Sequence, residues 1–303
     1  MNNKNKVLIL GVKGNLGGQL IKIFSESEYK VIGWDKEEID ITHKELILRK
    51  VGKIKPAIII NAVAYNAVDK CEENKGEFAL AQKLNGETVG YLAEAALAVG
   101  AVLVHYSTDY VFGGVDEKKI KEVKGKGGFR EDDEPVPINK YAETKLAGEK
   151  EIIKRNGQGL RWYLIRTSKL FGPRGQSESA KPSFFDIMLS LAPEREELEV
   201  VDEEISCFTY TPDLARATKK LITSHSNFGI YHLVNSGPAT WYEGARELFK
   251  LAGVKIKIKP VPASHFPRPA KRPQYSVLAN TKFTQLRPWS EALAEYLKYH
   301  YHQ

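Results

Sequence analysis

The sequence predicts an α/β fold: a doubly wound parallel sheet of Rossmann type with a smaller C-terminal substrate-binding domain. Three observations support this fold class. Short apolar runs alternate with helical segments as far as Thr167, the first run leads into a glycine-rich turn, and polar side chains follow the later runs. A chain of 303 residues can bury the core of one large domain or two modest ones.

The first element is a strand, Lys6–Leu10, which leads into a glycine-rich turn and an amphipathic helix. This is the context that a dinucleotide fingerprint requires. Gly11 would allow the tight turn, Gly14 would let the backbone approach a pyrophosphate, and Gly17 would let helix and strand pack closely. The helix N-terminus would offer free N–H groups to the phosphates. The Gly-x-x-Gly-x-x-Gly spacing resembles that of the short-chain dehydrogenase/reductase superfamily.

The second strand, residues 30–34, ends at Asp35. A carboxylate at this position commonly holds the ribose hydroxyls of adenosine, and it favours NADH because a 2′-phosphate would meet like charge. Lys36 follows directly and could pair with such a phosphate, so the sequence leaves both NADH and NADPH open as the cofactor. Asp35 could also be an ordinary solvated turn residue.

The third and fourth strands, residues 57–61 and 101–107, are continuous apolar runs joined by an amphipathic helix over 78–99. Such runs indicate strands that are buried on both faces of a parallel sheet. Polar side chains follow each strand directly. Because ligands bind outside the carboxyl ends of the strands in these sheets, we expect these polar side chains to line a ligand site.

A tyrosine and a lysine, Tyr141 and Lys145, stand one helical turn apart in a predicted helix. An ammonium beside a phenol favours the phenolate, so we expect the pKa of Tyr141 to fall from about 10 toward neutrality. A phenol of this kind can give a proton to a carbonyl oxygen while a hydride reaches the carbon. The pair alone is also compatible with two solvated residues on an exposed helix.

Several segments together resemble the dTDP-4-dehydrorhamnose reductase family, which comprises extended short-chain reductases of nucleotide-sugar biosynthesis. The resemblance covers nearly the whole chain, and its segments are Gly11–Gly17, Asn61–Cys71, Ser107–Phe112, Tyr141–Glu149, Ile165–Ser168, Gly229–His232 and Arg272–Leu278. It implies NAD(P)H-dependent reduction of the 4-keto group of a nucleotide-linked deoxysugar, with dTDP-4-dehydro-L-rhamnose as the expected substrate.

The resemblance also implies roles for individual residues. Thr108, Tyr141 and Lys145 would be catalytic, with Thr108 at the C4 oxygen of the sugar and Asp109 at its hydroxyls. Lys145 would also reach the nicotinamide ribose. Tyr141 would contact the cofactor as well. The remaining cofactor contacts would fall on the glycine-rich turn, the end of the second strand and the segment after the third strand: Gly11, Gly14, Asn15, Leu16, Gly17, Asp35, Asp40, Ile41, Ala62, Ala64, Tyr65 and Asn66.

Two departures from the family pattern lie on the substrate side. Lys169 stands where family members often carry a tryptophan that flanks the sugar nucleotide, and we expect it either to pair with the diphosphate or to point to solvent. Residues 203–209 retain little of the usual family stretch. Two alternatives therefore stay open: a nucleotide-sugar epimerase or dehydratase of the same superfamily, or a binding protein like the regulatory subunit of methionine adenosyltransferase.

We expect residues 1–170 to form the cofactor-binding domain, with 208–234 returning to it, and residues 171–207 and 235–303 to form the substrate-binding domain. Residues 116–128 resemble an exposed, charged insertion.

The formal net charge of +7 arises from scattered lysines and not from a basic stripe, which argues against a nucleic-acid partner. No metal-ligand spacing, leader or membrane-spanning run is evident, so we expect a cytoplasmic enzyme without a metal. A homodimer is compatible with the sequence.

Overall fold

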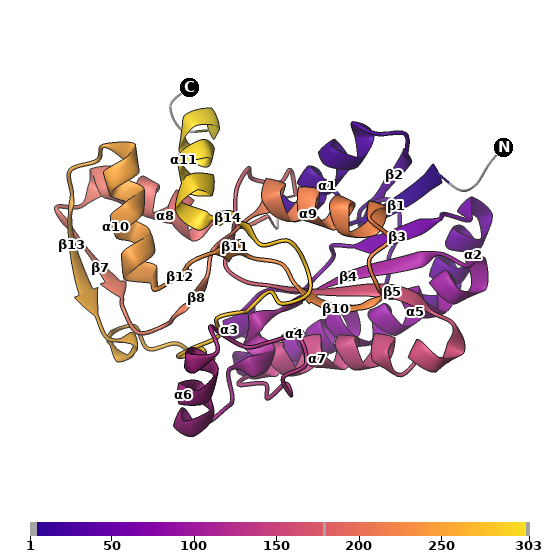
Figure 1. Cartoon of the computed structure of the whole chain (residues 1–303), viewed down its shortest axis with the longest axis horizontal. Coiled ribbons are helices and arrows are strands. Elements are labelled where there is room, and N and C mark those ends of the chain that lie inside the picture. The colour runs from indigo at the N-terminus through magenta and orange to yellow at the C-terminus, as the bar shows by residue number, and fades with distance from the viewer. Residues whose placement is uncertain (1–4, 178–179, 301–303) are drawn as a thin grey trace.

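The computed structural model describes residues 5–177 and 180–300. Its centre is a parallel sheet with the strand order β10-β5-β4-β3-β1-β2 (Figure 1). The strands are β1 (Lys6–Leu10), β2 (Lys30–Trp34), β3 (Ile58–Asn61), β4 (Val102–Thr108), β5 (Arg161–Thr167) and β10 (Gly229–His232). The predicted doubly wound α/β fold is therefore confirmed.

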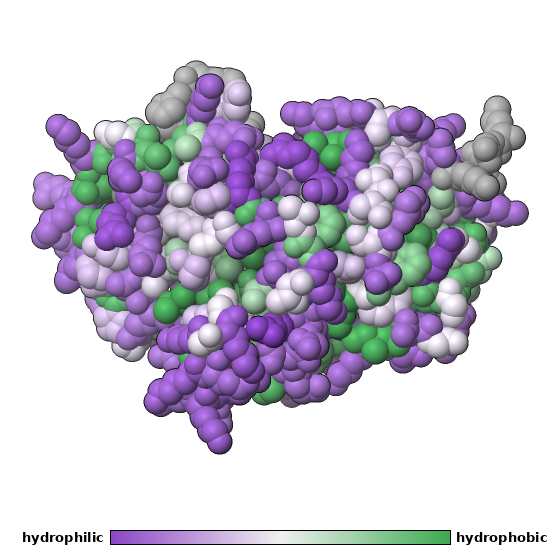
Figure 2. All heavy atoms as spheres, viewed as in Figure 1, coloured by the Kyte–Doolittle hydropathy of each residue, from purple (hydrophilic) through white to green (hydrophobic). Residues whose placement is uncertain are grey.

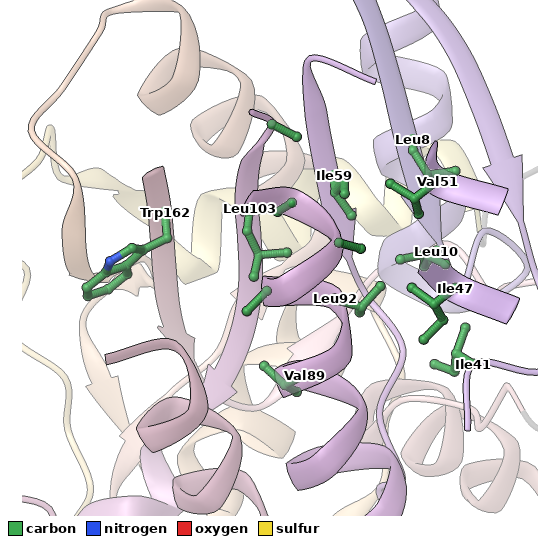
Figure 3. Packing of buried hydrophobic residues seen from close by; sticks show 14 of the residues in the cluster. Leu8, Leu10, Ile41, Ile47, Val51, Ile59, Val89, Leu92, Leu103 and Trp162 are labelled. Carbon is green, nitrogen blue, oxygen red and sulfur yellow. The ribbon is translucent and has the colours of Figure 1, made fainter. Parts of the chain in front are cut away.

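Helices cover both faces of this sheet (Figure 1). One face carries α2 (Lys44–Ile54), α5 (Thr88–Val99) and α7 (Lys140–Ile153), and the other carries α1 (Asn15–Ser25) and α9 (Thr211–Thr223). Figure 3 shows the first of these two interfaces, where Ile59 and Leu103 of the sheet meet Leu92 of α5. Each buried aliphatic side chain of this size contributes about 1.5–3 kcal/mol, which explains why the strand sequences are apolar throughout.

The strand order reverses at β1. Strand β2 lies on one side of β1 and β3 on the other, so the crossover from β1 to β2 and the crossover from β2 to β3 run in opposite directions. In sheets of this kind the ligand site lies at this reversal, outside the carboxyl ends of the strands. The glycine-rich turn follows β1 at this point.

A second group of elements packs beside the sheet around its own aromatic core, which includes Phe185, Phe208 and Leu293 (Figure 1). Strands β7 and β13 pair in parallel, and three further two-stranded pairs join β6 to β9, β8 to β12 and β11 to β14. The division of the chain into two domains at residues 170, 207 and 234 stays a prediction. The elements of this group are β6 (Leu170–Phe171), α8 (Phe184–Leu191), β7 (Glu197–Val201), β8 (Ser206–Cys207), β9 (Thr209–Tyr210), β11 (Asn235–Ser236), β12 (Pro238–Ala239), α10 (Trp241–Ala252), β13 (Lys257–Val261), β14 (Leu286–Pro288) and α11 (Trp289–His300).

The segment expected as an exposed insertion contains a helix, α6 (Glu117–Gly125). Asp116 caps it by accepting the backbone N–H of Lys119, and Val123 is fully buried beside Phe112 and Phe129. The interpretation of this whole segment as exposed is thus wrong. Its outer surface is nevertheless a hydrophilic projection at the bottom of the molecule, where α6 lies in the same view (Figures 1 and 2).

Two short α-helices, α3 (Val68–Glu73) and α4 (Lys75–Ala81), and a π-helical turn over Gln82–Glu87 precede α5. Within residues 5–177 and 180–300, no helix is both long and apolar enough to cross a membrane. The two cysteines, Cys71 and Cys207, are buried thiols and are not joined by a disulfide.

Candidate active site

The glycine-rich turn has the geometry of a phosphate cradle. Gly11 takes a left-handed backbone conformation with φ of 79°, and Gly14 stands at the N-cap of α1, where it has no side chain to cap the helix. A Cβ atom at Gly17 would lie 1.9 Å from the carbonyl oxygen of Gly11, so only glycine lets α1 start this close to β1. The N-terminal N–H groups of α1 and its dipole therefore face the carboxyl edge of the sheet, which fits a dinucleotide pyrophosphate.

Asn15 joins this turn to the segment after β6. Its Oδ1 accepts the backbone N–H of Gly175 at 2.8 Å, and its Nδ2 donates to the carbonyl oxygen of Lys181 at 3.0 Å. Ser177 N–H adds a bond to the carbonyl oxygen of Lys13 at 2.9 Å. The sequence did not predict this contact. The one local signal is a glycine at position 175, because a glycine lets another part of the backbone approach closely.

Asp35 is half-buried against the same turn. Its two carboxylate oxygens accept the backbone N–H groups of Lys13 and Lys36, each at 2.9 Å. Asp35 is thus tied to the phosphate turn, whereas the Lys36 side chain is exposed. Its contact with an adenosine ribose stays a prediction.

The other predicted adenosine contacts follow β2 a few residues later. Asp40 is exposed, and its carboxylate accepts the backbone N–H and the hydroxyl of Thr42, which lower the pKa of Asp40. Ile41 is buried, and its carbonyl oxygen accepts the hydroxyl of Thr88 on α5. Leu16 is likewise buried, so it can offer the cofactor only its backbone.

The segment after β3 holds Ala62, Ala64, Tyr65 and Asn66, and Asn85 fixes its position. The amide of Asn85 accepts the N–H of Tyr65 and donates to the carbonyl oxygen of Tyr65, both at 2.9 Å. The side chain of Tyr65 turns instead to Glu77, while Ala64 and Asn66 are exposed. Asn85 lies in the π-helical turn and also donates to Thr144 of α7. Sequence reasoning placed Asn85 in a helix without giving it this role.

Side chains of helix α7 form hydrogen bonds to the end of strand β4. Asn139 caps α7 at the backbone N–H of Ala142, which sets the start of the helix and hence the direction of its side chains. Lys145 then donates to the carbonyl oxygen of Tyr106 at 2.7 Å. One turn further along α7, Glu149 accepts the hydroxyl of Ser107.

The pair formed by Glu149 and Arg166 is buried beneath these contacts. Arg166 of β5 donates to both carboxylate oxygens of Glu149, at 3.0 and 2.7 Å, and the two side chains are at most 1% exposed. Removing one partner of such a pair costs about 3–5 kcal/mol because the other charge stays buried. The pair therefore fixes β5 against α7, and the Ser107 hydroxyl joins the end of β4 to the same carboxylate.

Tyr141 itself meets Thr108 and Tyr110. Its phenol lies beside the Thr108 hydroxyl, and its ring lies edge-on to Tyr110 with centroids 5.9 Å apart. Burial and the nearby Asp109 carboxylate both raise the pKa of Tyr141, whereas the Thr108 hydroxyl lowers it. The expectation that this pKa falls toward neutrality is wrong for this structure, because desolvation dominates and the Lys145 ammonium is directed to Tyr106. A phenol that stays protonated is suited to donating a proton.

Lys145 is 2% exposed, and burial lowers its pKa to about 8, an effect that Glu149 opposes.

Asp109 is likewise 2% exposed, and its carboxylate accepts hydrogen bonds from the hydroxyls of Thr108 at 3.1 Å and Ser276 at 2.6 Å. Sequence reasoning expected Asp109 to hold sugar hydroxyls but gave no role to Ser276, which comes from the C-terminal part of the chain.

Lys169 points into the second group of elements and not to solvent. Its ammonium lies 4.0 Å from the ring centroid of Trp241 and 4.9 Å from that of Phe208. It donates to the carbonyl oxygens of Glu204 and Ala239 at 3.1 and 3.2 Å. The backbone of Lys169 takes a left-handed conformation, with φ of 38°, that residues other than glycine rarely adopt.

A phosphate cradle at the reversal of a parallel sheet, beside a buried tyrosine–lysine pair, defines an NAD(P)H-dependent oxidoreductase of Rossmann fold. The chain belongs to the family whose model is described as the RmlD substrate binding domain and matches residues 5–302. Among the described residues, no group of three or more histidine, cysteine and acidic side chains could hold a metal ion.

Two curated relatives are similar over nearly the whole chain. Spore coat polysaccharide biosynthesis protein SpsK of Bacillus subtilis is 36% identical over 297 residues, which cover 97% of each protein. The dTDP-4-dehydrorhamnose reductase of Escherichia coli strain K12 is 36% identical over 293 residues, covering 92% of this chain and 91% of that protein.

Solved structures show the same relationship. The dTDP-4-dehydrorhamnose reductase of Bacillus anthracis in complex with NADP has a TM-score of 0.86 at 35% identity, over 97% of this chain and 99% of that chain. The UDP-glucose 4-epimerase of Thermus thermophilus in complex with NAD has a TM-score of 0.76 over 97% of this chain and 99% of that one. At 20% identity, this second likeness shows the shared fold alone.

Proposed function

We propose that the protein reduces the 4-keto group of a nucleotide-linked deoxysugar, with dTDP-4-dehydro-L-rhamnose as substrate, dTDP-L-rhamnose as product and NADPH or NADH as cofactor. The observation that carries this proposal is the contact of Tyr141 with Thr108, with Lys145 on the next turn of α7. The relatives named above as dTDP-4-dehydrorhamnose reductases, one of them bound to NADP, support the substrate and the cofactor.

The glycine-rich turn, Asp35 and Lys145 would hold the cofactor, which supplies the hydride when bound. Tyr141 donates the phenol proton to the C4 oxygen of the sugar, and its raised pKa keeps that proton in place until charge develops on the oxygen. Thr108 lies against the same phenol and orients the C4 oxygen. The ammonium of Lys145 favours the phenolate that remains after proton donation.

The test is oxidation of NADPH or NADH by the purified protein with dTDP-4-dehydro-L-rhamnose. We expect Tyr141→Phe to lower kcat by about 10²–10⁴-fold while the variant still binds the cofactor, because only the proton donor is lost. Tyr231→Phe is a matched control, since Tyr231 lies on β10 and its phenol hydroxyl donates to the backbone carbonyl oxygen of Asn227. A wild-type protein that binds cofactor but leaves the keto sugar unchanged would overturn the proposal. Cofactor regeneration without net oxidation would instead indicate an epimerase or dehydratase.

We further propose that Lys169 contributes to substrate discrimination, because it occupies an aromatic site beside Asp109 and Glu204. A panel of dTDP-, UDP-, GDP- and CDP-linked 4-keto sugars, assayed with NADH and with NADPH, tests this role. We expect Lys169→Trp to raise the affinity for dTDP-sugars. Strict selectivity for dTDP in the wild type, unchanged by the substitution, would show that Lys169 does not set specificity. The same panel decides whether Asp35 or Lys36 governs the choice of cofactor.

A further inference from the structure

The hydroxyl of Thr108 carries a single proton, and the structure shows where that proton goes. Thr108 donates it to Oδ1 of Asp109 at 3.1 Å, while Thr108 Oγ1 accepts the backbone N–H of Tyr110 at 3.2 Å. A hydroxyl donates only one hydrogen bond. While Thr108 donates to Asp109, it therefore cannot donate to an oxygen of a bound substrate.

Ser276 holds the other oxygen of the same carboxylate. Its Oγ donates to Oδ2 of Asp109 at 2.6 Å, and its backbone N–H donates to the carbonyl oxygen of Ile205 at 2.9 Å. Residues 275–278 thus connect the end of β4 to the loop before β8, which carries Glu204. Asp109 consequently receives one proton donor from the catalytic strand end and one from the C-terminal part of the chain.

Asp109 is almost completely enclosed. Burial raises the pKa of its carboxyl group, whereas the hydroxyls of Ser276, Ser168 and Thr108 lower it. The positive charge of the Lys169 ammonium, on the turn after β5, also lowers this pKa. The other ionisable side chains that face it come from the turn after β4, from α7 and from β8, and burial raises the pKa of each: Tyr110, Tyr141 and Cys207. Two further charged side chains lie beside these groups: Glu204 lies beside Lys169, and Arg272 lies beside Tyr110.

We propose that Asp109 is a positioning residue that controls the Thr108 proton, and that Ser276 adjusts this control. When ionised, Asp109 accepts a charge-assisted hydrogen bond from Thr108 and withholds the proton from the sugar. When neutral, it is a weaker acceptor and leaves Thr108 free to donate to the C4 oxygen beside Tyr141. The inference rests on the proposed reduction and deepens it.

The sign of the pH dependence follows from this arrangement. As pH rises through the pKa of Asp109, the Thr108 hydroxyl donates to the ionised carboxylate instead of to the sugar, and kcat falls. The loss of one donor to a developing oxyanion lowers kcat by about 10²-fold. Ser276→Ala removes a bond that favours the carboxylate, so the decline should move to higher pH. Asp109→Asn cannot ionise, so the decline should disappear and only the decline belonging to Lys145 should remain.

The experiment measures the pH profile of kcat with NADPH and dTDP-4-dehydro-L-rhamnose for the wild type, Ser276→Ala, Ser276→Thr and Asp109→Asn. Ser276→Thr keeps the hydroxyl and should restore the wild-type profile. Ser183→Ala is the matched structural control, because Ser183 also donates to an aspartate, Asp186, at the start of α8. We expect this control to lower thermal stability and to leave the pH profile unchanged.

Wild-type pH profiles in both Ser276→Ala and Asp109→Asn would overturn the role of Asp109. If Asp109→Asn does not fold, as judged by circular dichroism, Ser276→Ala decides alone, because it removes only one oxygen atom. A wild-type protein without turnover at any pH refutes the proposed reaction itself. An active wild type with unaltered variants refutes only this inference.

Discussion

At the scale of the single residue, the site depends on a competition between burial and charge. The spacing of Tyr141 and Lys145 predicts that the two side chains share a helix face, but it does not show where the ammonium is directed. In the structure the ammonium binds the carbonyl oxygen of Tyr106, and desolvation dominates the phenol. The outcome is a protonated tyrosine beside a lysine whose pKa is about 8.

This lysine predicts a loss of turnover in mildly alkaline solution. Because burial lowers the pKa of Lys145 to about 8, its positive charge is lost as pH rises through that value, and kcat should decline there. Lys145→Arg should have a lower kcat at every pH, but its decline should move upward by at least about one pH unit, since a guanidinium stays charged. The pH profile of kcat measures this, with thermal unfolding as the control for folding. An unmoved decline in the arginine variant would assign it to another group.

At the scale of the element, the glycine-rich turn shows how closely sequence and backbone agree. The strand, turn and helix around Gly11, Gly14 and Gly17 could be predicted because each glycine answers a local steric demand. The contact of Asn15 with Gly175 could not, because it joins residues 160 positions apart. Helix α6 was missed for a related reason: Val123 is one apolar residue among lysines, and only its tertiary neighbours show that it is buried.

Two adjacent glycines of α1 provide a matched prediction. A Cβ atom at Gly17 would lie 1.9 Å from the Gly11 carbonyl oxygen, whereas one at Gly18 would lie 3.7 Å from that of Val12. Gly17→Ala must therefore displace the turn, and we expect at least a tenfold loss of NADPH affinity together with lower stability. Gly18→Ala should keep wild-type affinity, with stability unchanged or raised by about 0.4–1 kcal/mol. Titration of cofactor binding and urea unfolding test both variants; equal cofactor affinities would contradict the steric argument.

At the scale of the whole molecule, one ion-pair network joins the helices around the sheet to the second group of elements. Arg287 of β14 donates to Asp213 of α9 at 2.8 Å and pairs with Glu295 of α11 at 2.7 Å. Asn235 of β11 donates to the same carboxylate at 2.8 Å. The sequence places Asp213 in the first turn of a helix. Asn235 and Arg287 lie 22 and 74 residues away, so local pattern could not predict these two partners.

The position of Arg287 predicts a pH-dependent contribution to stability. Burial alone would raise the pKa of Asp213, but hydrogen bonds from Arg287, Asn235 and Arg216 outweigh burial and lower it. A lowered pKa means that the network stabilises the fold above the ordinary aspartate pKa of about 3.9 and that this stability is lost as pH falls through the pKa of the folded state. Arg287→Met should therefore lower the free energy of unfolding by about 1–2 kcal/mol at pH 7, since the pair is only partly exposed.

The difference between wild type and Arg287→Met should shrink as the pH falls, because the wild type then loses the same interaction. Urea unfolding at a series of pH values measures it. Arg246→Met, on an exposed position of α10, is the matched control and should lie within about 0.5 kcal/mol of the wild type at every pH. The argument depends on the junction and not on arginine as such: equal losses in the two variants, or a loss for Arg287→Met that persists unchanged into acid, would show that Asp213 and Arg287 do not hold the two groups of elements together.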